Sequence, residues 1–380
     1  MRVGVRKETA DGERRVALVP DGVEKLHGVE VVVERGAGLR AGWTDDRFTE
    51  AGATVADGAA VAAADIVVGV HPPAGTGPAT GATASAGPWH IALFDPLWNP
   101  EPVGLLAATG ISAFSLDLVP RTTRAQSMDV LSSMATVAGY RAALLGAARL
   151  PRLFPMLMTA AGTLAPARVL VLGAGVAGLQ AIATARRLGA VVHGYDVRPA
   201  AAEQIRSLGA KAIEEGAVDD IEDAGGYARA QTADDAARQR SLLGPFVEAA
   251  DVLITTAAIP GRASPLLVTN DMVATMRPGT VVIDLAAERG GNVEPSVADT
   301  EVDHHGVLVL GPTRLTSEAA DHASTMFSNN VVNLINHLVA EADGLDPDLS
   351  DEITAGMLVT HRGEVVHPMV KQALDVRAPT

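Results

Sequence analysis

Three glycines followed by one carboxylate form the pattern with the clearest chemistry in this sequence. Gly173, Gly175 and Gly178 are spaced as G-x-G-x-x-G and directly follow the apolar run 169–172. Asp196 ends the next apolar run. This spacing lets a strand turn sharply into a helix and lets the backbone approach a pyrophosphate, whose charge the helix N-terminus stabilises. The pattern predicts a dinucleotide site; the alternative is an ordinary strand–helix turn made of small residues.

Asp196 also predicts which dinucleotide is preferred. Its carboxylate would accept hydrogen bonds from the adenosine ribose hydroxyls and would repel a 2′-phosphate, so NAD(H) is favoured over NADP(H). Arg198 lies two residues further along the chain. It weakens this preference, because a nearby arginine can accommodate a 2′-phosphate.

A polar, partly basic segment at 119–133 is the second candidate for chemistry. It contains four side chains that could converge on a cleft: Arg121, Gln126, Asp129 and Ser132. The alternative is a helix start, with Ser127 as the N-cap and Asp129 in the first turn, where the helix dipole favours a negative charge. The residues alone leave both interpretations open.

The elements that must position these residues form two successive series of strands and helices. Apolar runs alternate with helical segments, which is the pattern of parallel sheets covered by helices. The runs of the first series are Arg2–Val5, Val29–Val33, Asp65–Val70, Ile91–Phe94 and Ile111–Leu116. Those of the second are Val169–Leu172, Val191–Tyr195, Val252–Thr256, Val281–Leu285 and Val307–Leu310. A helix over Ser132–Leu150 joins the two series, and a helix over Met326–Ala340 precedes a polar tail.

The sequence therefore predicts an α/β protein with two Rossmann-like, doubly wound parallel-sheet domains and a cleft between them. A length of 380 residues fits two domains. The first domain is expected at 1–132, completed by 322–380, and the NAD(H)-binding domain at 133–321. Ligand is expected at the carboxyl ends of the strands, at the switch point of the sheet.

The composition excludes several classes of site. A net charge of −15 argues against a nucleic-acid partner, because phosphate binding needs clustered Lys and Arg. The sequence has no cysteine, which excludes disulfides, cysteine-ligated zinc and thiol catalysis. His304 and His305 are adjacent, but no third ligand follows at a regular spacing, so we predict a surface turn and no metal. No apolar run approaches the roughly 20 residues of a membrane helix, so direct membrane insertion is not expected.

Several further segments match one family. They are 120–133, 138–142, 159–163, 224–228, 254–261, 282–286 and 290–292. Together they resemble the soluble NAD(H)-binding domain I of the proton-translocating NAD(P) transhydrogenases, which is the first portion of the alpha subunit in the split-gene form; this family is related to the alanine dehydrogenases. Segments 6–8 and 12–20 also match, but alanine dehydrogenases share them. The resemblance covers nearly the whole chain and is most specific around Gln126 and Gly226–Ala228.

The resemblance implies roles for residues at both ends of the cofactor. Four residues match positions that contact the nicotinamide end and are catalytic in a positioning sense: Arg121, Gln126, Asp129 and Ser132. Tyr227 matches a tyrosine on a mobile loop that closes over NAD(H). At the position of Ala258 family members more often have Leu, which makes its packing role less secure. The cofactor-binding residues predicted from the motif and the resemblance are Gly173, Gly175, Val176, Ala177, Gly178, Asp196, Val197, Arg198, Gly226, Tyr227, Ala228, Ala257 and Ala258.

The resemblance also implies partners. Hydride would pass directly between NAD(H) held by this chain and NADP(H) held by a partner subunit. The chain stops after the soluble domain, as in the split-gene form, so the membrane helices and the NADP(H)-binding domain are expected on other chains. We therefore expect a cytoplasmic homodimer that docks one NADP(H)-binding domain and is peripheral to the inner or plasma membrane through its partner subunits.

Two other functions use the same scaffold. An alanine dehydrogenase needs an Arg for the substrate carboxylate, which Arg15 matches, and a Lys and a His near the carbonyl. The corresponding segments carry no such Lys, and His71 and His90 are displaced. Without a cation and an acid at those places, polarising a carbonyl is difficult. A non-catalytic NAD(H) sensor would need the same pocket, but it could lose the residues at the nicotinamide end.

We predict that Gln126→Asn leaves NADH binding largely intact and slows hydride transfer by roughly tenfold to a hundredfold, because the shorter side chain would misplace the reacting ring. NADH fluorescence titration measures the first quantity. Single-turnover transfer to an added NADP(H)-binding domain measures the second. A normal transfer rate in this variant would contradict the positioning role.

Overall fold

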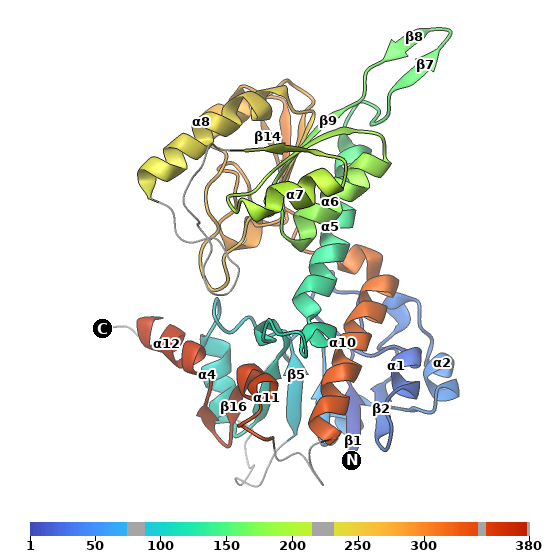
Figure 1. The fold of residues 1–380 in the computed structure, drawn as a ribbon. Helices are drawn as coiled ribbons and strands as arrows, with labels where there is room; N and C mark the ends of the chain where they lie inside the picture. The colour runs from blue at the N-terminus through green and yellow to red at the C-terminus, as the bar shows by residue number, and fades with distance from the viewer. Residues whose placement is uncertain (74–87, 215–231, 341–346, 378–380) are drawn as a thin grey trace. The chain divides into compact units, whose positions relative to one another are not determined.

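Figure 1 shows the fold in a computed structural model, which describes residues 1–73, 88–214, 232–340 and 347–377. The chain divides into two compact units. Unit 1 is Met1–Met134 with Thr316–Thr380, and unit 2 is Ala135–Leu315. The sequence places the second division later, at 322. The returning chain joins unit 1 earlier because the hydroxyl of Ser317 donates a hydrogen bond to the buried carboxylate of Glu13.

Unit 1 is built on a mainly parallel sheet that has eight strands within the described residues. Their order is β17-β16-β6-β5-β4-β1-β2-β3. The parallel strands are β1 (Arg2–Val5), β2 (Glu30–Glu34), β3 (Thr54–Ala56), β4 (Ile66–Val68), β5 (Trp89–Ala92) and β6 (Ser112–Ser115). Strands β16 (Leu358–His361) and β17 (Glu364–Val365) add to the β6 edge in antiparallel orientation. The order of β1 to β6 is that of a Rossmann sheet, with the switch between β1 and β4.

The helices of unit 1 come from both ends of the chain. Its N-terminal segment contributes α1 (Pro20–Glu24), α2 (Asp45–Glu50), α3 (Gly58–Ala62) and α4 (Glu101–Ala108). The C-terminal segment contributes α10 (Ala320–Ala340), α11 (Glu352–Met357) and α12 (Pro368–Arg377). Helix α10 lies against α1 and against the short 3₁₀ helices η1 (Leu39–Ala41) and η3 (Gln126–Met128). The unit therefore needs both chain segments to complete its core.

Unit 2 repeats the same sheet order. Within the described residues the order is β11-β10-β9-β12-β13-β15-β14, and only β14 is antiparallel. The strands are β9 (Arg168–Leu172), β10 (Val191–Tyr195), β11 (Lys211–Ile213), β12 (Val252–Thr255), β13 (Val281–Asp284), β14 (Glu301–His304) and β15 (Val307–Leu310). The helices are α6 (Val176–Arg187), α7 (Ala200–Ser207), α8 (Ala233–Ala249) and α9 (Asn270–Ala274).

The central strand β9 shows why the sheet of unit 2 is covered on both faces. Val169 and Val171 are buried in one core cluster with residues of α6 and α7, whereas Leu170 and Leu172 are buried in a second cluster with residues of α8 and α9. Side chains alternate between the two faces of a strand, so an uninterrupted apolar run requires a core on each side. Both units thus confirm the predicted Rossmann-like α/β class.

Some elements differ from the sequence-based prediction. The segment around Thr159 is not a loop but a two-stranded hairpin, β7 (Leu157–Thr159) and β8 (Gly162–Leu164). The predicted polar tail instead contains α11, β16, β17 and α12. In that tail Leu358 and Val359 are buried, and the short strand that carries them forms because it pairs with β6, which no local pattern reveals.

The prediction that no segment resembles a membrane helix is also wrong by length and composition. Helix α5 (Val130–Arg149) is long and apolar enough to cross a membrane, and it is the one helix among the described residues that meets this test. The core helix of a soluble protein meets it equally well. Ala142 and Ala143 are completely buried in the core of unit 2, which accounts for the apolar sequence of this stretch of the helix.

Candidate functional site

The glycine motif of unit 2 forms the predicted turn between β9 and α6. Gly173 has φ +95°, a backbone conformation that side chains disfavour. A Cβ on Gly178 would lie 1.8 Å from the carbonyl oxygen of Gly173, so this position must remain Gly for the helix to pack. A Cβ on Gly175 would meet no protein atom within 4 Å. The three glycines therefore have distinct roles, and Gly175 leaves open space at the start of α6.

The register of the sheet places the other candidate residues at the same edge. Leu172 at the end of β9 pairs with Tyr195 of β10 on one side and with Thr255 of β12 on the other. The residues that follow these three positions, which include Gly173 and Asp196, must therefore emerge together. This edge lies at the switch point, where doubly wound sheets bind their ligands.

Asp196 is bound within the protein by four N–H donors. Its Oδ2 accepts from the backbone N–H of Ala174 at 2.7 Å and from Arg198 Nη2 at 3.1 Å. Its Oδ1 accepts from the backbone N–H and Nε of Arg198, both at 2.9 Å. The carboxylate thus fixes the glycine turn, and a ribose hydroxyl would have to share it with the Arg198 guanidinium. Arg198, predicted to weaken the preference for NAD(H), is an ion-pair partner of the residue that sets this preference.

The remaining predicted cofactor residues of unit 2 surround this edge. Val176 and Ala258 are exposed, and Ala177, Val197 and Ala257 are half-buried. Gly226, Tyr227 and Ala228 lie outside the described residues. The open space at Gly175, next to the N-terminus of the 12-residue helix α6, is where a pyrophosphate would fit. The residues present are therefore suited to a dinucleotide.

Sequence reasoning gave no role to two buried polar residues beside this edge. Asp284 ends β13 and Asn292 follows it after a turn; both side chains are completely buried. They hydrogen-bond to each other and to the segment that follows β12. The signal available in the sequence was the pair Gly290–Gly291 directly before Asn292, because both glycines have positive φ.

The nicotinamide-end candidates belong to unit 1, and two of them form a helix cap. Asp129 directly precedes α5, and its carboxylate accepts from the backbone N–H of Ser132 at 2.9 Å and from its hydroxyl at 2.6 Å. The N-cap is therefore Asp129, and the expectation that Ser127 caps the helix is wrong. A hydrogen-bonded Asp at this position satisfies an otherwise unpaired helix N–H.

The other two candidates, Arg121 and Gln126, have exposed side chains. Gln126 begins η3, and this short helix is fixed to α10 because the carbonyl oxygen of Ser127 accepts from Asn330 and Asn333. The buried side chain of Met128 anchors the same turn. Gln126 is thus presented to solvent from a rigid turn, which suits contact with a ligand or partner. The roles of the four residues toward nicotinamide stay predictions.

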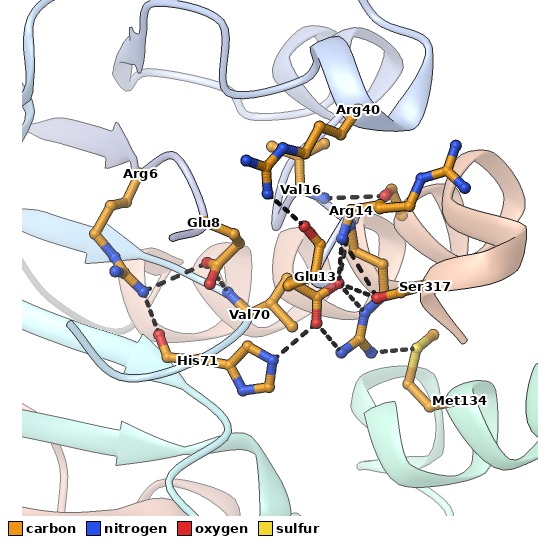
Figure 2. A network of polar contacts seen from close by, with 12 residues as sticks. Arg6, Glu8, Glu13, Arg14, Val16, Arg40, Val70, His71, Met134 and Ser317 are labelled. Carbon is orange, nitrogen blue, oxygen red and sulfur yellow. Dashed lines mark hydrogen bonds and ion pairs between the residues drawn. The ribbon is translucent and has the colours of Figure 1, made fainter. Parts of the chain in front are cut away.

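Figure 2 shows a buried network of charges in unit 1, centred on Glu13. Arg15 donates from Nε at 2.8 Å and from Nη2 at 2.6 Å to the two oxygens of this carboxylate. His71 Nε2 lies 2.8 Å from the same carboxylate, and Ser317 donates to it as well. Nη1 of Arg15 contacts the sulfur of Met134 at 3.2 Å. The network neutralises charges that burial would otherwise make costly.

The ionisation of these groups follows from their surroundings. Burial would raise the pKa of Glu13, but the hydrogen bonds from Arg15 and His71 outweigh it and hold this pKa well below its usual range. Burial raises the pKa of Glu8, although Arg6 opposes the shift. Burial, assisted by the charge of Arg6, lowers the pKa of His90 to about 4. His90 is therefore uncharged near neutral pH.

No group of three or more His, Cys, Asp or Glu side chains in the described regions of the chain is arranged to hold a metal ion. His304 and His305 lie at the turn between β14 and β15, with their rings in edge-to-face contact and their centroids 4.6 Å apart. His305 adopts φ +57°, as tight turns often require. The pair therefore belongs to a surface hairpin.

Comparison with known proteins gives consistent matches over the whole chain. Residues 4–138 match the family model "Alanine dehydrogenase/PNT, N-terminal domain", and residues 142–368 match "Alanine dehydrogenase/PNT, C-terminal domain". The chain is 45% identical to the first of the separately encoded portions of NAD(P) transhydrogenase subunit alpha from Rhodospirillum rubrum, over 97% of this chain and 98% of that one. It is 31% identical to alanine dehydrogenase of Bacillus subtilis, over 87% and 83%.

Solved structures agree with these matches. The structure of a transhydrogenase from Sinorhizobium meliloti superposes with a TM-score of 0.82 at 40% identity, covering 97% of this chain and 99% of that one. An L-alanine dehydrogenase gives the same TM-score at 25% identity, covering 99% of each chain. The fold is thus shared by both groups, while sequence identity is higher to the transhydrogenases.

Two glycine variants separate the packing role from the binding role of the turn. We predict that Gly178→Ala destabilises unit 2 by about 1–3 kcal/mol, because its Cβ would overlap backbone atoms. Gly175→Ala should leave stability unchanged and weaken NADH binding about tenfold or more, because its methyl group would fill the open space. Thermal unfolding and NADH titration measure the two effects. Equal NADH affinity for wild type and folded Gly175→Ala would rule out this space as the pyrophosphate site.

Proposed function

The chain belongs to the alanine dehydrogenase/PNT family, and we propose that it is the NAD(H)-binding subunit of a proton-translocating NAD(P) transhydrogenase. In this role it takes part in direct hydride transfer between NAD(H) on this chain and NADP(H) on a partner subunit. The observation that carries the proposal is the edge of unit 2, where the open space at Gly175 meets the N-terminus of α6 beside Asp196. Near-complete coverage of relatives named as the first portion of transhydrogenase subunit alpha supports it.

The residues of unit 2 would hold the cofactor. The N-terminus of α6 would bind the pyrophosphate, and Asp196 would accept a hydrogen bond from the adenosine ribose in exchange for one from Arg198. Val176, Val197 and Ala258 would line the adenosine side. When bound, the cofactor supplies the hydride chemistry, and the chain supplies binding and orientation.

The residues of unit 1 would act at the nicotinamide end. The carboxylate of Asp129 is already held by Ser132, so this pair presents a fixed group of hydrogen-bonding atoms. Gln126 would hold the ring at the partner surface, and Arg121 would anchor a phosphate or Asp129. Because direct transfer needs no proton donor, rigid positioning is the main requirement on these residues.

Alanine dehydrogenase activity is the second candidate, favoured by the shared fold and by the match of Arg15. The surroundings of this residue argue against it. The Arg15 guanidinium is paired with Glu13, and the imidazole of His71 contacts the same carboxylate. His90 is buried and uncharged near neutral pH, so it cannot serve as the acid that protonates a carbonyl oxygen.

The partners and location follow from the same proposal. The NADP(H)-binding domain and the membrane-embedded subunits would be other chains, and this chain would be cytoplasmic and peripheral to the inner or plasma membrane through them. Names of relatives as subunit alpha support the existence of partner subunits. Helix α5 is apolar in composition, but its Ala142 and Ala143 lie in the core of unit 2, so we assign it no membrane role.

An exposed apolar hairpin supports a homodimer. Strands β7 and β8 extend from unit 2 in Figure 1. The side chains of Met156, Met158 and Leu164 on or next to them are 58%, 77% and 53% exposed. Contiguous apolar surface of this kind marks a protein–protein interface. The hairpin is therefore our candidate for the contact between two copies of the chain.

The decisive experiment measures reduction of an NAD+ analogue by NADPH. We expect turnover only when an NADP(H)-binding transhydrogenase domain is added, because the two nucleotides lie on different proteins. NADH binding to this chain alone, followed by fluorescence, is the control. No turnover in the mixture despite NADH binding would contradict the proposal. An assay with alanine and NAD+ would then separate the alanine dehydrogenase from a non-catalytic NAD(H) sensor.

A charge on the hairpin tests the dimer. We predict that Met158→Asp weakens self-association at least tenfold, because burying an unpaired carboxylate in an interface is costly. Leu105→Asp on α4, where the native side chain is 65% exposed, is the matched control and should have no effect. Sedimentation velocity over a concentration series measures both. An unchanged dimer in Met158→Asp would exclude the hairpin as the interface.

A further inference from the structure

Asn292 is a completely buried amide whose side chain is used almost fully by one loop. Its Oδ1 accepts from the backbone N–H of Ala257 at 3.0 Å, and its Nδ2 donates to the carbonyl oxygens of Ala257 and Pro265, both at 2.8 Å. The backbone carbonyl of Asn292 accepts from Leu267 and Val268. One residue therefore binds both ends of the loop 257–265.

Asp284 holds Asn292 in this place. Its carboxylate is completely buried and accepts from the backbone N–H of Asn292 at 2.8 Å and of Val293 at 3.2 Å. It also accepts from the hydroxyl of Thr255 at the end of β12, at 2.9 Å. A Cβ on Gly291 would lie 2.7 Å from this carboxylate, so the chain can return to Asn292 only through a glycine.

The loop that Asn292 binds begins beside the glycine turn. The hydroxyl of Thr256 donates to the carbonyl oxygen of Gly173 at 3.1 Å. A Cβ on Gly173 would lie 3.1 Å from the backbone nitrogen of Ala257, which shows how closely the two segments approach. Displacement of Ala257 would therefore alter the edge at which the dinucleotide is proposed to bind.

We propose that Asn292 is a positioning residue of the dinucleotide site: its amide fixes the main chain at Ala257 and Ala258, so that this segment forms a rigid wall beside the glycine turn. The inference rests on the proposed function, since it concerns the same site. Asn292 acts through the loop and need not touch the cofactor. Pre-organising a binding wall increases affinity because less conformational freedom is lost on binding.

The chemistry of the contacts explains why this position needs an amide. Two carbonyl oxygens require donors and one backbone N–H requires an acceptor, and a single Asn side chain supplies all three. An ionised Asp would supply only acceptors and would place a second negative charge next to Asp284. A protonated Asp would supply one donor and one acceptor. The substitution Asn292→Asp therefore converts a permanent donor into one that depends on pH.

The test compares Asn292→Asp, Asn292→Ala and wild type by NADH titration between pH 5.5 and pH 8, with thermal unfolding measured at each pH. We expect Asn292→Asp to bind NADH about tenfold more weakly than wild type at pH 8 and to regain affinity, relative to wild type, as pH falls. Asn292→Ala should bind weakly throughout the range. Asn336→Asp, which makes the same change on an exposed side chain of α10, should behave like wild type.

Three outcomes would overturn the inference. The first is wild-type affinity in both folded variants, and the second is a loss of affinity in Asn292→Asp that does not change with pH. The third is a loss that follows the fraction of unfolded protein in both variants, which would assign Asn292 to stability alone. If wild type itself failed to bind NADH, the proposed function would fail and the inference with it. Binding by wild type with unchanged variants would sink only the role of Asn292.

Discussion

The carboxyl ends of β9, β10 and β12 lie level with one another, and the candidate site depends on that register. Leu172, Tyr195 and Thr255 are paired side by side, so the glycine turn, Asp196 and the loop at Ala257 emerge at one edge. Parallel strands in a doubly wound sheet meet at such an edge by construction. A shift of one residue in any of the three strands would move the corresponding group to the other face of the sheet.

Polar groups that do not bind the cofactor keep this edge in place. Asp196 spans from Arg198 to the backbone of Ala174, and Asn292 connects the two ends of the loop 257–265. Buried polar groups are stable only when their hydrogen bonds are satisfied, so each of these side chains permits few backbone arrangements. A site that recognises its ligand largely through backbone and small side chains needs this rigidity, because such groups cannot adjust by changing rotamer.

Unit 1 has the same strand order but a different edge. The segment that follows β1 carries Arg6 and Glu8 instead of a glycine turn, and Glu8 accepts from the backbone of Val70 after β4. Glu13 and Arg15 complete a network in which buried charges neutralise one another. Charged side chains therefore occupy the edge that small residues leave open in unit 2. The shared fold sets where a ligand can bind, and the residues at the edge decide whether a dinucleotide fits there.

Features that depend on local pattern could be predicted from the sequence. Apolar runs indicated β1, β10 and β15 with their observed bounds, and the glycine spacing indicated the turn into α6, because neighbouring residues fix both. Features that depend on distant residues became visible only in the folded chain. Strand β16 exists because it pairs with β6, more than two hundred residues earlier in the chain, and Asn292 has a role because the fold brings Ala257 to it. Contacts between segments far apart in sequence leave no periodic signal within either segment, so no local pattern could reveal them.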